Sequence, residues 1–282
     1  MLKSGLRALA NASLALLDTN AAGRYLYAQL IDSIRGRTQV VKYRDVQLTL
    51  TVPNAQNKFR ADTFATKEPE TLEWIAAIPR GAVLWDIGAN VGLYSCFAAK
   101  SRGCRVFAFE PSVFNLEMLA RNTHLNGVTQ LVTLIPLPLS NGLGLSTLNM
   151  SSTEWGGALS TFGESYGHDG RPLHKQFEFS TLGLSMDQVV ALLQIPQPLY
   201  IKMDVDGIEH LILAGGADVL RGVEAVLIEI NDAFQQQSEQ SRQLLSAAGF
   251  RLKDKRRWDA MTGSEFESAF NQIWHRAEEV RS

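Results

Sequence analysis

The sequence predicts an α/β fold built on a doubly wound, mostly parallel sheet. Apolar runs at 83–87, 106–109 and 225–230 each contain or precede acidic or amide residues, and the alternating run at 199–205 reads as a fourth strand. Continuous apolar runs of this length are typical of parallel strands that are covered on both faces. Helical patterns separate the runs, and this alternation predicts a Rossmann-like sheet with helices on both sides.

The remaining elements follow from local start and stop signals. Pro79 ends one helical pattern, and Gly249 ends a later crossover helix. We expect a helix, a strand hairpin and a second helix before the sheet, and a crossover helix and a late antiparallel strand after it. In chain order these elements cover residues 1–35, 39–52, 70–78, 238–248 and 272–276.

Two regions are expected along the chain. Residues 1–80 form an N-terminal helical and strand extension, and residues 81–282 form the main domain with an insertion near 141–179. The insertion reads as a long irregular loop, and such loops in compact domains are usually functional. We expect it to supply much of an acceptor pocket, with Trp155 and Tyr166 stacking on the bound molecule.

A glycine-rich turn follows the first apolar strand. Gly88 and Gly92 permit close approach of a ligand to the backbone, and Asn90 tolerates unusual backbone angles. The second strand ends at Glu110, where a carboxylate is placed to accept hydrogen bonds from both ribose hydroxyls. Together these residues predict a nucleoside site.

The identity of the nucleoside depends on Asp86, which precedes the turn by two residues. A pyrophosphate binder favours Gly-x-Gly-x-x-Gly, whereas here Asn90 replaces the middle glycine and an acid is close by. That acid repels pyrophosphate and suits the ammonium group of S-adenosylmethionine (SAM). SAM is therefore favoured over NAD. An NAD-dependent oxidoreductase and a noncatalytic SAM-binding module remain the alternatives.

A second group of charged residues follows the strands at 199–205 and 225–231. Asp204, Lys202 and Glu229 are expected at the same sheet edge as the nucleoside site, because the carboxyl ends of parallel strands share one edge. Asp204, Glu229 and Asn231 offer the hard oxygen ligands of a possible Mg²⁺ site. Asp204, Lys202 and His168 are the catalytic candidates, with His174 and His210 as further bases.

Several separated stretches resemble FkbM-type methyltransferases over residues 66–232. They are Asp-Ile-Gly-Ala-Asn-Val-Gly-Leu-Tyr-Ser at 86–95, Phe-Glu-Pro at 109–111, Leu-Ser-Asn at 139–141, Ile-Lys-Met-Asp-Val-Asp-Gly-Ile-Glu at 201–209 and Ile-Glu-Ile-Asn at 228–231. The resemblance implies a class I methyltransferase fold and SAM-dependent O-methylation of a hydroxyl on a saccharide or secondary metabolite.

Site residues carried over from this resemblance are expectations. Asp86, Gly88, Asn90 and Gly92 form the SAM turn. Glu110 with Pro111 holds the ribose, Leu139 and Ser140 border the adenine, and Asp204 lies near the methionine end. Asp206 departs from the family, which usually has Glu at this position.

The amino-acid composition limits the classes of molecule that this protein is expected to bind. A net charge of -2 provides no basic field for nucleic acid, so a neutral, hydroxyl-rich small molecule or saccharide is the expected acceptor. Cys96 and Cys104 lack metal-ligand spacing and are expected as reduced core residues of a cytoplasmic protein. No run approaches the ~20 apolar residues of a membrane span. Residues 1–17 suggest an amphipathic helix that packs on the domain or, alternatively, contacts a membrane surface. The oligomeric state stays open.

Overall fold

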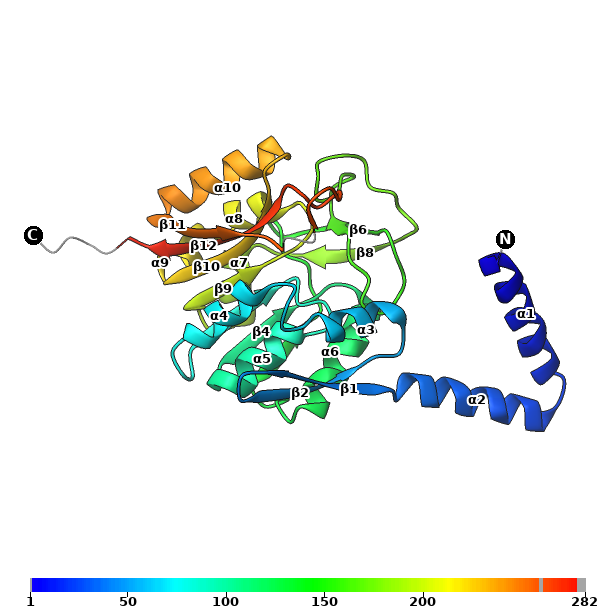
Figure 1. Cartoon of the computed structure of the whole chain (residues 1–282). Helices are drawn as coiled ribbons and strands as arrows, with labels where there is room; N and C mark the ends of the chain where they lie inside the picture. The colour runs from blue at the N-terminus through cyan, green and yellow to red at the C-terminus, as the bar shows by residue number, and fades with distance from the viewer. Residues whose placement is uncertain (1, 259–260, 278–282) are drawn as a thin grey trace, which may run out of the picture.

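A computed structural model describes residues 2–258 and 261–277 and contains a seven-stranded sheet between two helical layers (Figure 1). The strand order is β11-β12-β10-β9-β3-β4-β5. The pairs between β10, β9, β3, β4 and β5 are parallel, whereas β12 is antiparallel to both of its neighbours. These strands are β3 (Val83–Ile87), β4 (Arg105–Phe109), β5 (Val132–Ile135), β9 (Tyr200–Met203), β10 (Ala225–Asn231), β11 (Phe250–Arg256) and β12 (Ala269–Arg276). The predicted fold class is confirmed.

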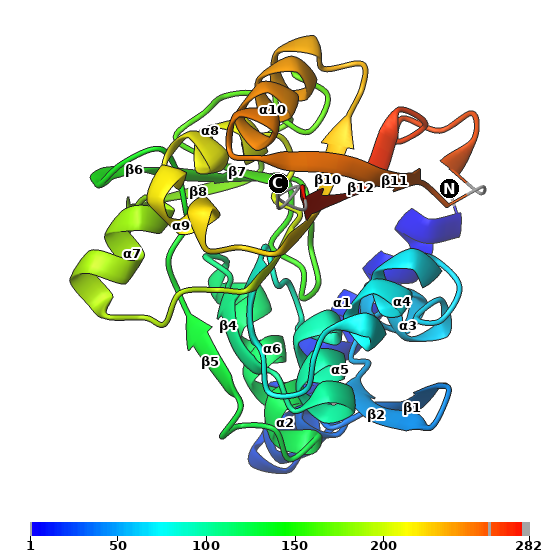
Figure 2. The same cartoon turned by 90° about the vertical axis from the view of Figure 1, so that its left-hand side faces the viewer.

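Helices cover both faces of the sheet (Figure 2), and each layer has its own apolar core. One layer consists of α4 (Pro69–Ala77), α5 (Leu93–Arg102) and α6 (Val113–Leu125). The other consists of α7 (Met186–Leu193), α8 (Glu209–Ala214), α9 (Ala217–Arg221) and α10 (Gln235–Ala247). Trp85 and Phe109 pack in the second core at a ring distance of 5.1 Å. Burial on both faces explains why the strands are continuous apolar runs.

The segment 141–179 is not the irregular loop that its composition predicts. Much of it forms a three-stranded antiparallel sheet of β6 (Gly144–Met150), β7 (Ser160–Phe162) and β8 (Phe177–Gly183), in the order β7-β6-β8. Leu148, Met150 and Phe162 from this small sheet are buried in the second core. The exposed and half-buried positions of β6 and β8, with the intervening glycines, hid the alternating pattern in the sequence.

The N-terminal region divides differently from the expected boundary at residue 80. The hairpin of β1 (Thr38–Tyr43) and β2 (Val46–Thr51), together with α3 (Ala55–Asp62) and α4, contributes to the first core. Only α1 (Leu2–Leu17) and α2 (Ala21–Arg35) extend away from this body as an arm (Figure 1). We therefore propose that the folded domain begins near residue 38.

The arm contradicts the expectation that residues 1–17 pack on the domain. In α1, the described side chains are exposed except that of Leu17, which is half-buried, and Leu6 and Leu9 are 60% and 67% exposed. At the end of α2, Arg35 contacts the body through Glu117 at 2.8 Å. No helix within the described ranges is long and apolar enough to cross a bilayer. Cys96 and Cys104 are buried and unbridged, as predicted.

Candidate cofactor and acceptor site

The turn after β3 adopts the left-handed backbone that its sequence predicts. Gly88, Asn90 and Gly92 have φ values of 80°, 49° and 79°. The sequence predicted that these glycines let a ligand approach the backbone, but in the structure they make room for other parts of the protein. A Cβ at Gly88 would lie 1.8 Å from the Asp204 carbonyl oxygen, and one at Gly92 would lie 2.3 Å from Leu119. Both glycines therefore allow close packing of protein against the turn.

Glu110 links the second strand to this turn. Its Oε2 accepts a hydrogen bond from the Asn90 amide at 2.7 Å, and its Oε1 accepts one from the Ser112 amide at 2.8 Å. Burial raises the pKa of Glu110 to about 7, although both amides favour the ionised form. Each carboxylate oxygen keeps a further lone pair for a ligand hydroxyl.

A narrow cavity opens beside Glu110 between the ends of β4, β5 and β9. Its volume is about 60 Å³, and Asn90 and Asp204 lie where it meets a larger cavity. Pro111 and Leu139 line it as expected, whereas Ser140 does not. The apolar lining also includes residues that sequence reasoning missed, namely Leu137, Pro138, Val205, Ile208 and Ile212.

Asp86 has a different partner from the predicted ligand ammonium. It is 1% exposed, lines neither cavity and accepts a hydrogen bond from the Ser95 hydroxyl at 2.6 Å. In the parallel register of β3 and β9 it lies opposite Lys202, whose Nζ is 3.7 Å from its Oδ1. The structure thus replaces the predicted contact with a buried ion pair.

Lys202 lies between the buried Asp86 and the larger cavity. Its Nζ lies 3.4 Å from Asp204 and 5.3 Å from the centre of the Tyr94 ring. Burial disfavours its charged form, but Asp204 and Asp86 outweigh this effect and raise the pKa of Lys202 above its usual range. A lysine held in its charged form orients Asp204 and does not act as a base.

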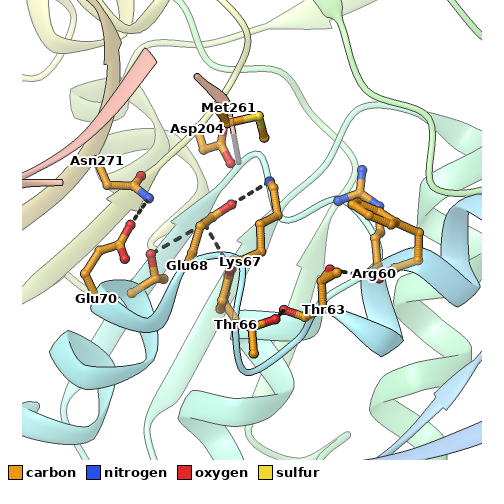
Figure 3. Close-up of polar contacts among 12 residues, drawn as sticks. Arg60, Thr63, Thr66, Lys67, Glu68, Glu70, Asp204, Met261 and Asn271 are labelled. Carbon is orange, nitrogen blue, oxygen red and sulfur yellow. Dashed lines mark hydrogen bonds and ion pairs between the residues drawn. The ribbon is translucent and has the colours of Figure 1, made fainter. Parts of the chain in front are cut away.

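A second ion pair at this edge was not predicted. Lys67 Nζ lies 2.6 Å from Glu68 (Figure 3). Glu68 also accepts a hydrogen bond from the Tyr94 hydroxyl at 2.9 Å. Burial opposes ionisation of Glu68, but the neighbouring Lys67 lowers its pKa to about 2. These residues lie at the start of the stretch that resembles the family, but no charge pattern in the sequence indicated that the two side chains pair.

The proposed magnesium ligands do not come together as predicted. Asp204 and Glu229 line the large cavity, but Asn231 does not, and its Oδ1 accepts a hydrogen bond from the Ala233 amide at 3.0 Å. Within residues 2–258 and 261–277, no three His, Cys, Asp or Glu side chains are grouped to hold a metal ion. Burial, with the charges of Asp204 and Glu68, raises the pKa of Glu229 well above its ordinary value.

The large cavity has a volume of about 260 Å³ and lies between α3, the end of β9 and the β11–β12 connection. Phe59, Arg60 and Thr63 come from α3 and its end, and Arg257, Trp258, Met261 and Phe266 come from the connection. Figure 3 shows Arg60, Lys67, Asp204 and Met261 around this space.

The residues that line the large cavity differ from the acceptor residues that were predicted from the sequence. From the segment 141–179 only Ala158 and Leu159 line the large cavity. The Trp155 indole donates a hydrogen bond to Glu117 at 3.2 Å, and Tyr166 packs against Phe234 at 5.3 Å. His168, predicted as catalytic, lines neither cavity and stacks on Phe266 at 4.7 Å.

The segment 157–160 separates the two cavities. The Gly157 carbonyl accepts hydrogen bonds from Asn90 Nδ2 at 2.9 Å and Asn115 Nδ2 at 3.0 Å. Asp206 Oδ2 accepts hydrogen bonds from the amides of Leu159 and Ser160. Burial and the nearby Asp204 raise the pKa of Asp206 to about 6. Position 206, where this chain has Asp and the family usually has Glu, is therefore the position that contacts the segment 157–160.

Comparisons with known proteins found a family model and a curated relative that each match about half of the chain or more. The family model described as the methyltransferase FkbM domain matches residues 86–252. The hexuronic acid methyltransferase AglP of Haloferax volcanii is 29% identical over 149 residues, which cover 53% of this chain and 56% of AglP. The chain therefore spans about half the length of this curated relative.

Solved methyltransferases are also similar. The precorrin-6y C5,15-methyltransferase of Geobacter metallireducens is 14% identical, with 74% and 87% of the two chains covered and a TM-score of 0.43. A putative rRNA methylase of Clostridium thermocellum is 11% identical, with 76% and 97% covered and a TM-score of 0.47. The family match, which spans more than half of the chain, is the basis of the assignment. The chain belongs to the FkbM methyltransferase family, whose cofactor is SAM.

The cavity residues fit this cofactor. Asn90 Oδ1 is buried without a partner among the described residues, and it belongs to a side chain that lines both cavities. With Glu110 and Asp204 it forms a set of acceptor oxygens, which suits a ligand that carries an ammonium group and ribose hydroxyls. Membership of a methyltransferase family removes the oxidoreductase alternative.

Proposed function

We propose that this protein transfers the methyl group of SAM to a hydroxyl oxygen of a saccharide. The observation that carries the proposal is the meeting of the narrow, mainly apolar cavity and the wide cavity at Asn90 and Asp204. A nucleoside fits the first chemically and a polar ring fits the second. The printed name of AglP, a hexuronic acid methyltransferase, supports a saccharide in preference to another secondary metabolite.

Each part of the crevice has a separate role in this proposal. Glu110 accepts hydrogen bonds from the ribose hydroxyls, and Leu137, Pro138 and Leu139 pack against the adenine. Asn90 and Asp204 accept hydrogen bonds from the methionine ammonium. SAM itself supplies a methyl group bonded to a sulfonium sulfur. The neutral thioether that remains after transfer is an excellent leaving group.

The protein's own contribution to transfer is alignment and proton removal. The wide cavity holds the acceptor hydroxyl in line with the methyl group, and this positioning lowers the entropic part of the barrier. Asp204 lines the cavity and is the group available to accept the hydroxyl proton. The Lys202 ammonium, fixed by Asp86, keeps Asp204 directed at the site.

The direct test is a screen of saccharide acceptors with methyl-labelled SAM. The expected result is formation of S-adenosylhomocysteine and a product 14 mass units heavier, as a methyl group replaces a hydrogen atom. An alkali-stable ether in the product would assign the label to oxygen. Turnover with any acceptor excludes a noncatalytic SAM-binding module, whereas SAM binding without turnover on any saccharide would contradict the proposal.

A further inference from the structure

Two arginines of the wide cavity have no carboxylate partner within the described part of the chain. Arg60 donates through Nε and Nη2 to the Gly156 carbonyl, at 3.3 and 2.8 Å. Arg257 donates to the Glu267 carbonyl and to the Thr262 hydroxyl, the latter at 3.3 Å. Both arginines are partly buried as whole residues, and these contacts leave donors on each guanidinium group for a ligand.

The other cations of the cavity are already engaged. Lys67 pairs with Glu68, and Lys202 pairs with Asp86 and Asp204. Among the cavity cations, the two arginines are thus those without a carboxylate partner in the described ranges 2–258 and 261–277. They come from α3 and from the β11–β12 connection, whereas Asp204 and Glu229 come from the strand ends. The cavity thus carries cationic groups and acidic groups on different structural elements.

Aromatic side chains accompany both arginines. Phe59 precedes Arg60, and Trp258 follows Arg257; their ring centroids are 6.3 Å apart with an angle of 50°. Phe59 is 46% exposed although it is large and apolar. Rings of this kind pack against the apolar face of a pyranose, while guanidinium groups bind carboxylates through two parallel hydrogen bonds.

We propose that Arg60 and Arg257 select an acceptor that carries a carboxylate, and that the acceptor is a uronic acid unit of a saccharide. The inference rests on the proposed function and specifies its substrate class. The carboxylate binds the two arginines, and the ring packs on Phe59 and Trp258. The reacting hydroxyl points to the opposite side, toward Asp204. This arrangement keeps the substrate carboxylate away from the acidic strand ends, where it would be repelled. A negatively charged acceptor thus replaces the neutral acceptor that was expected from the net charge of the protein.

The test compares methyl β-D-glucuronide with methyl β-D-glucoside, which differ only in the carboxylate at C6. S-adenosylhomocysteine formation gives kcat/KM for each acceptor. The wild-type protein is expected to prefer the glucuronide by at least about tenfold, the minimum for one charge-assisted bidentate contact. Arg60→Gln and Arg257→Gln should each remove most of this preference, mainly by raising KM for the glucuronide. Arg60→Lys should retain an intermediate preference.

Arg256→Gln is the matched control. Arg256 adjoins Arg257 in sequence, but it pairs with Glu73 and Asp254 and does not line the cavity. Its substitution should leave both acceptors unaffected. Calorimetric SAM binding and thermal unfolding will show that each variant is folded.

Equal or better use of the glucoside by the wild-type protein would overturn the inference and leave saccharide methylation intact. An unchanged glucuronide preference in both arginine variants would also overturn it. If no saccharide is methylated while another acceptor class is, the proposed function fails together with the inference.

Discussion

Asp206 fixes Leu159 across the cofactor crevice, because its Oδ2 accepts a hydrogen bond from the Leu159 amide at 2.7 Å. The same oxygen accepts a hydrogen bond from the Ser160 amide at 3.2 Å. Leu159 lines the wide cavity and Ser160 lines the narrow one, so the segment 157–160 lies between the two cavities. The narrow cavity measures about 60 Å³, far below the ~300–1,000 Å³ of typical small-molecule pockets. If the nucleoside of SAM binds in this cavity, we expect the segment 157–160 to move as it enters.

The first prediction concerns this movement. Asp206→Ala removes the acceptor of both amides, so the segment should open more readily and SAM should associate and dissociate about tenfold faster. That factor corresponds to a loss of about 1.4 kcal/mol, the scale of one hydrogen bond to a charged group. Stopped-flow tryptophan fluorescence measures both rates, with Asp169→Ala as an exposed-loop control. Rates equal to those of the wild-type protein would show that Asp206 does not restrain the segment.

The second prediction concerns pH. Burial raises the pKa of Glu110 to about 7 in the SAM-free protein. Ribose hydroxyls donate to the ionised carboxylate, so below pH 7 the protein must release a proton before it binds SAM. Affinity should consequently rise with pH up to about 7 and level off above it, with a slope approaching tenfold per unit at lower pH. Glu110→Gln should flatten this dependence. A wild-type affinity that does not change between pH 5.5 and 8 would contradict the assignment.

The third prediction concerns the buried ion pair of Asp86 and Lys202. Lys202→Met leaves Asp86 buried without its cation and should lower the free energy of unfolding by about 3–5 kcal/mol. The double variant Asp86→Asn with Lys202→Met should recover much of this loss, because the fully buried charge of Asp86 is then removed together with its cation. Urea denaturation at pH 7 measures both. Strictly additive losses would show that the two residues are not coupled.

The fourth prediction concerns the arm. Residues 1–37 contain five basic and two acidic residues, a net charge of +3 in a chain whose total is -2. Leu6, Leu9, Tyr25 and Leu30 are exposed. A basic segment with exposed apolar and tyrosine side chains suits an anionic membrane surface. We expect the full chain to float with phosphatidylglycerol vesicles and less with phosphatidylcholine vesicles, and Leu6→Glu with Leu9→Glu to abolish flotation.

Size-exclusion chromatography with light scattering distinguishes the competing explanation for the arm. A dimer that the same two substitutions convert to a monomer, together with absent vesicle binding, would mean that a second copy of the chain covers these leucines. The domain's own unfolding transition should be unaffected in either case, since the arm contributes no residue to the two apolar cores.

Local patterns predicted the sheet well because each strand carries its own signal. The apolar run that contains Trp85 and the one that contains Phe109 correspond to β3 and β4, and the glycine turn has the expected φ angles. The small sheet β6–β8 was missed because most residues of β6 and β8 are exposed or half-buried, so neither face of these strands is uniformly apolar.

The site was less predictable because its contacts join distant segments. Asp86 and Lys202 meet only through the register of β3 and β9, which no local pattern specifies. Arg60 and Trp258 reach one cavity from opposite ends of the chain, and neither lies in a motif. An acid before a glycine turn was recognisable in the sequence, but whether its partner is a ligand or a lysine depends on that register.

The most direct test of the account is calorimetric titration of SAM into the wild-type protein and Glu110→Ala at pH 8, where Glu110 is ionised. The wild-type protein should bind one SAM per chain. The variant should bind more weakly by about 1.5–3 kcal/mol, or roughly tenfold to a hundredfold, through loss of charge-assisted hydrogen bonds to the ribose. Unchanged affinity in a folded Glu110→Ala protein would place the nucleoside elsewhere and contradict the crevice assigned here.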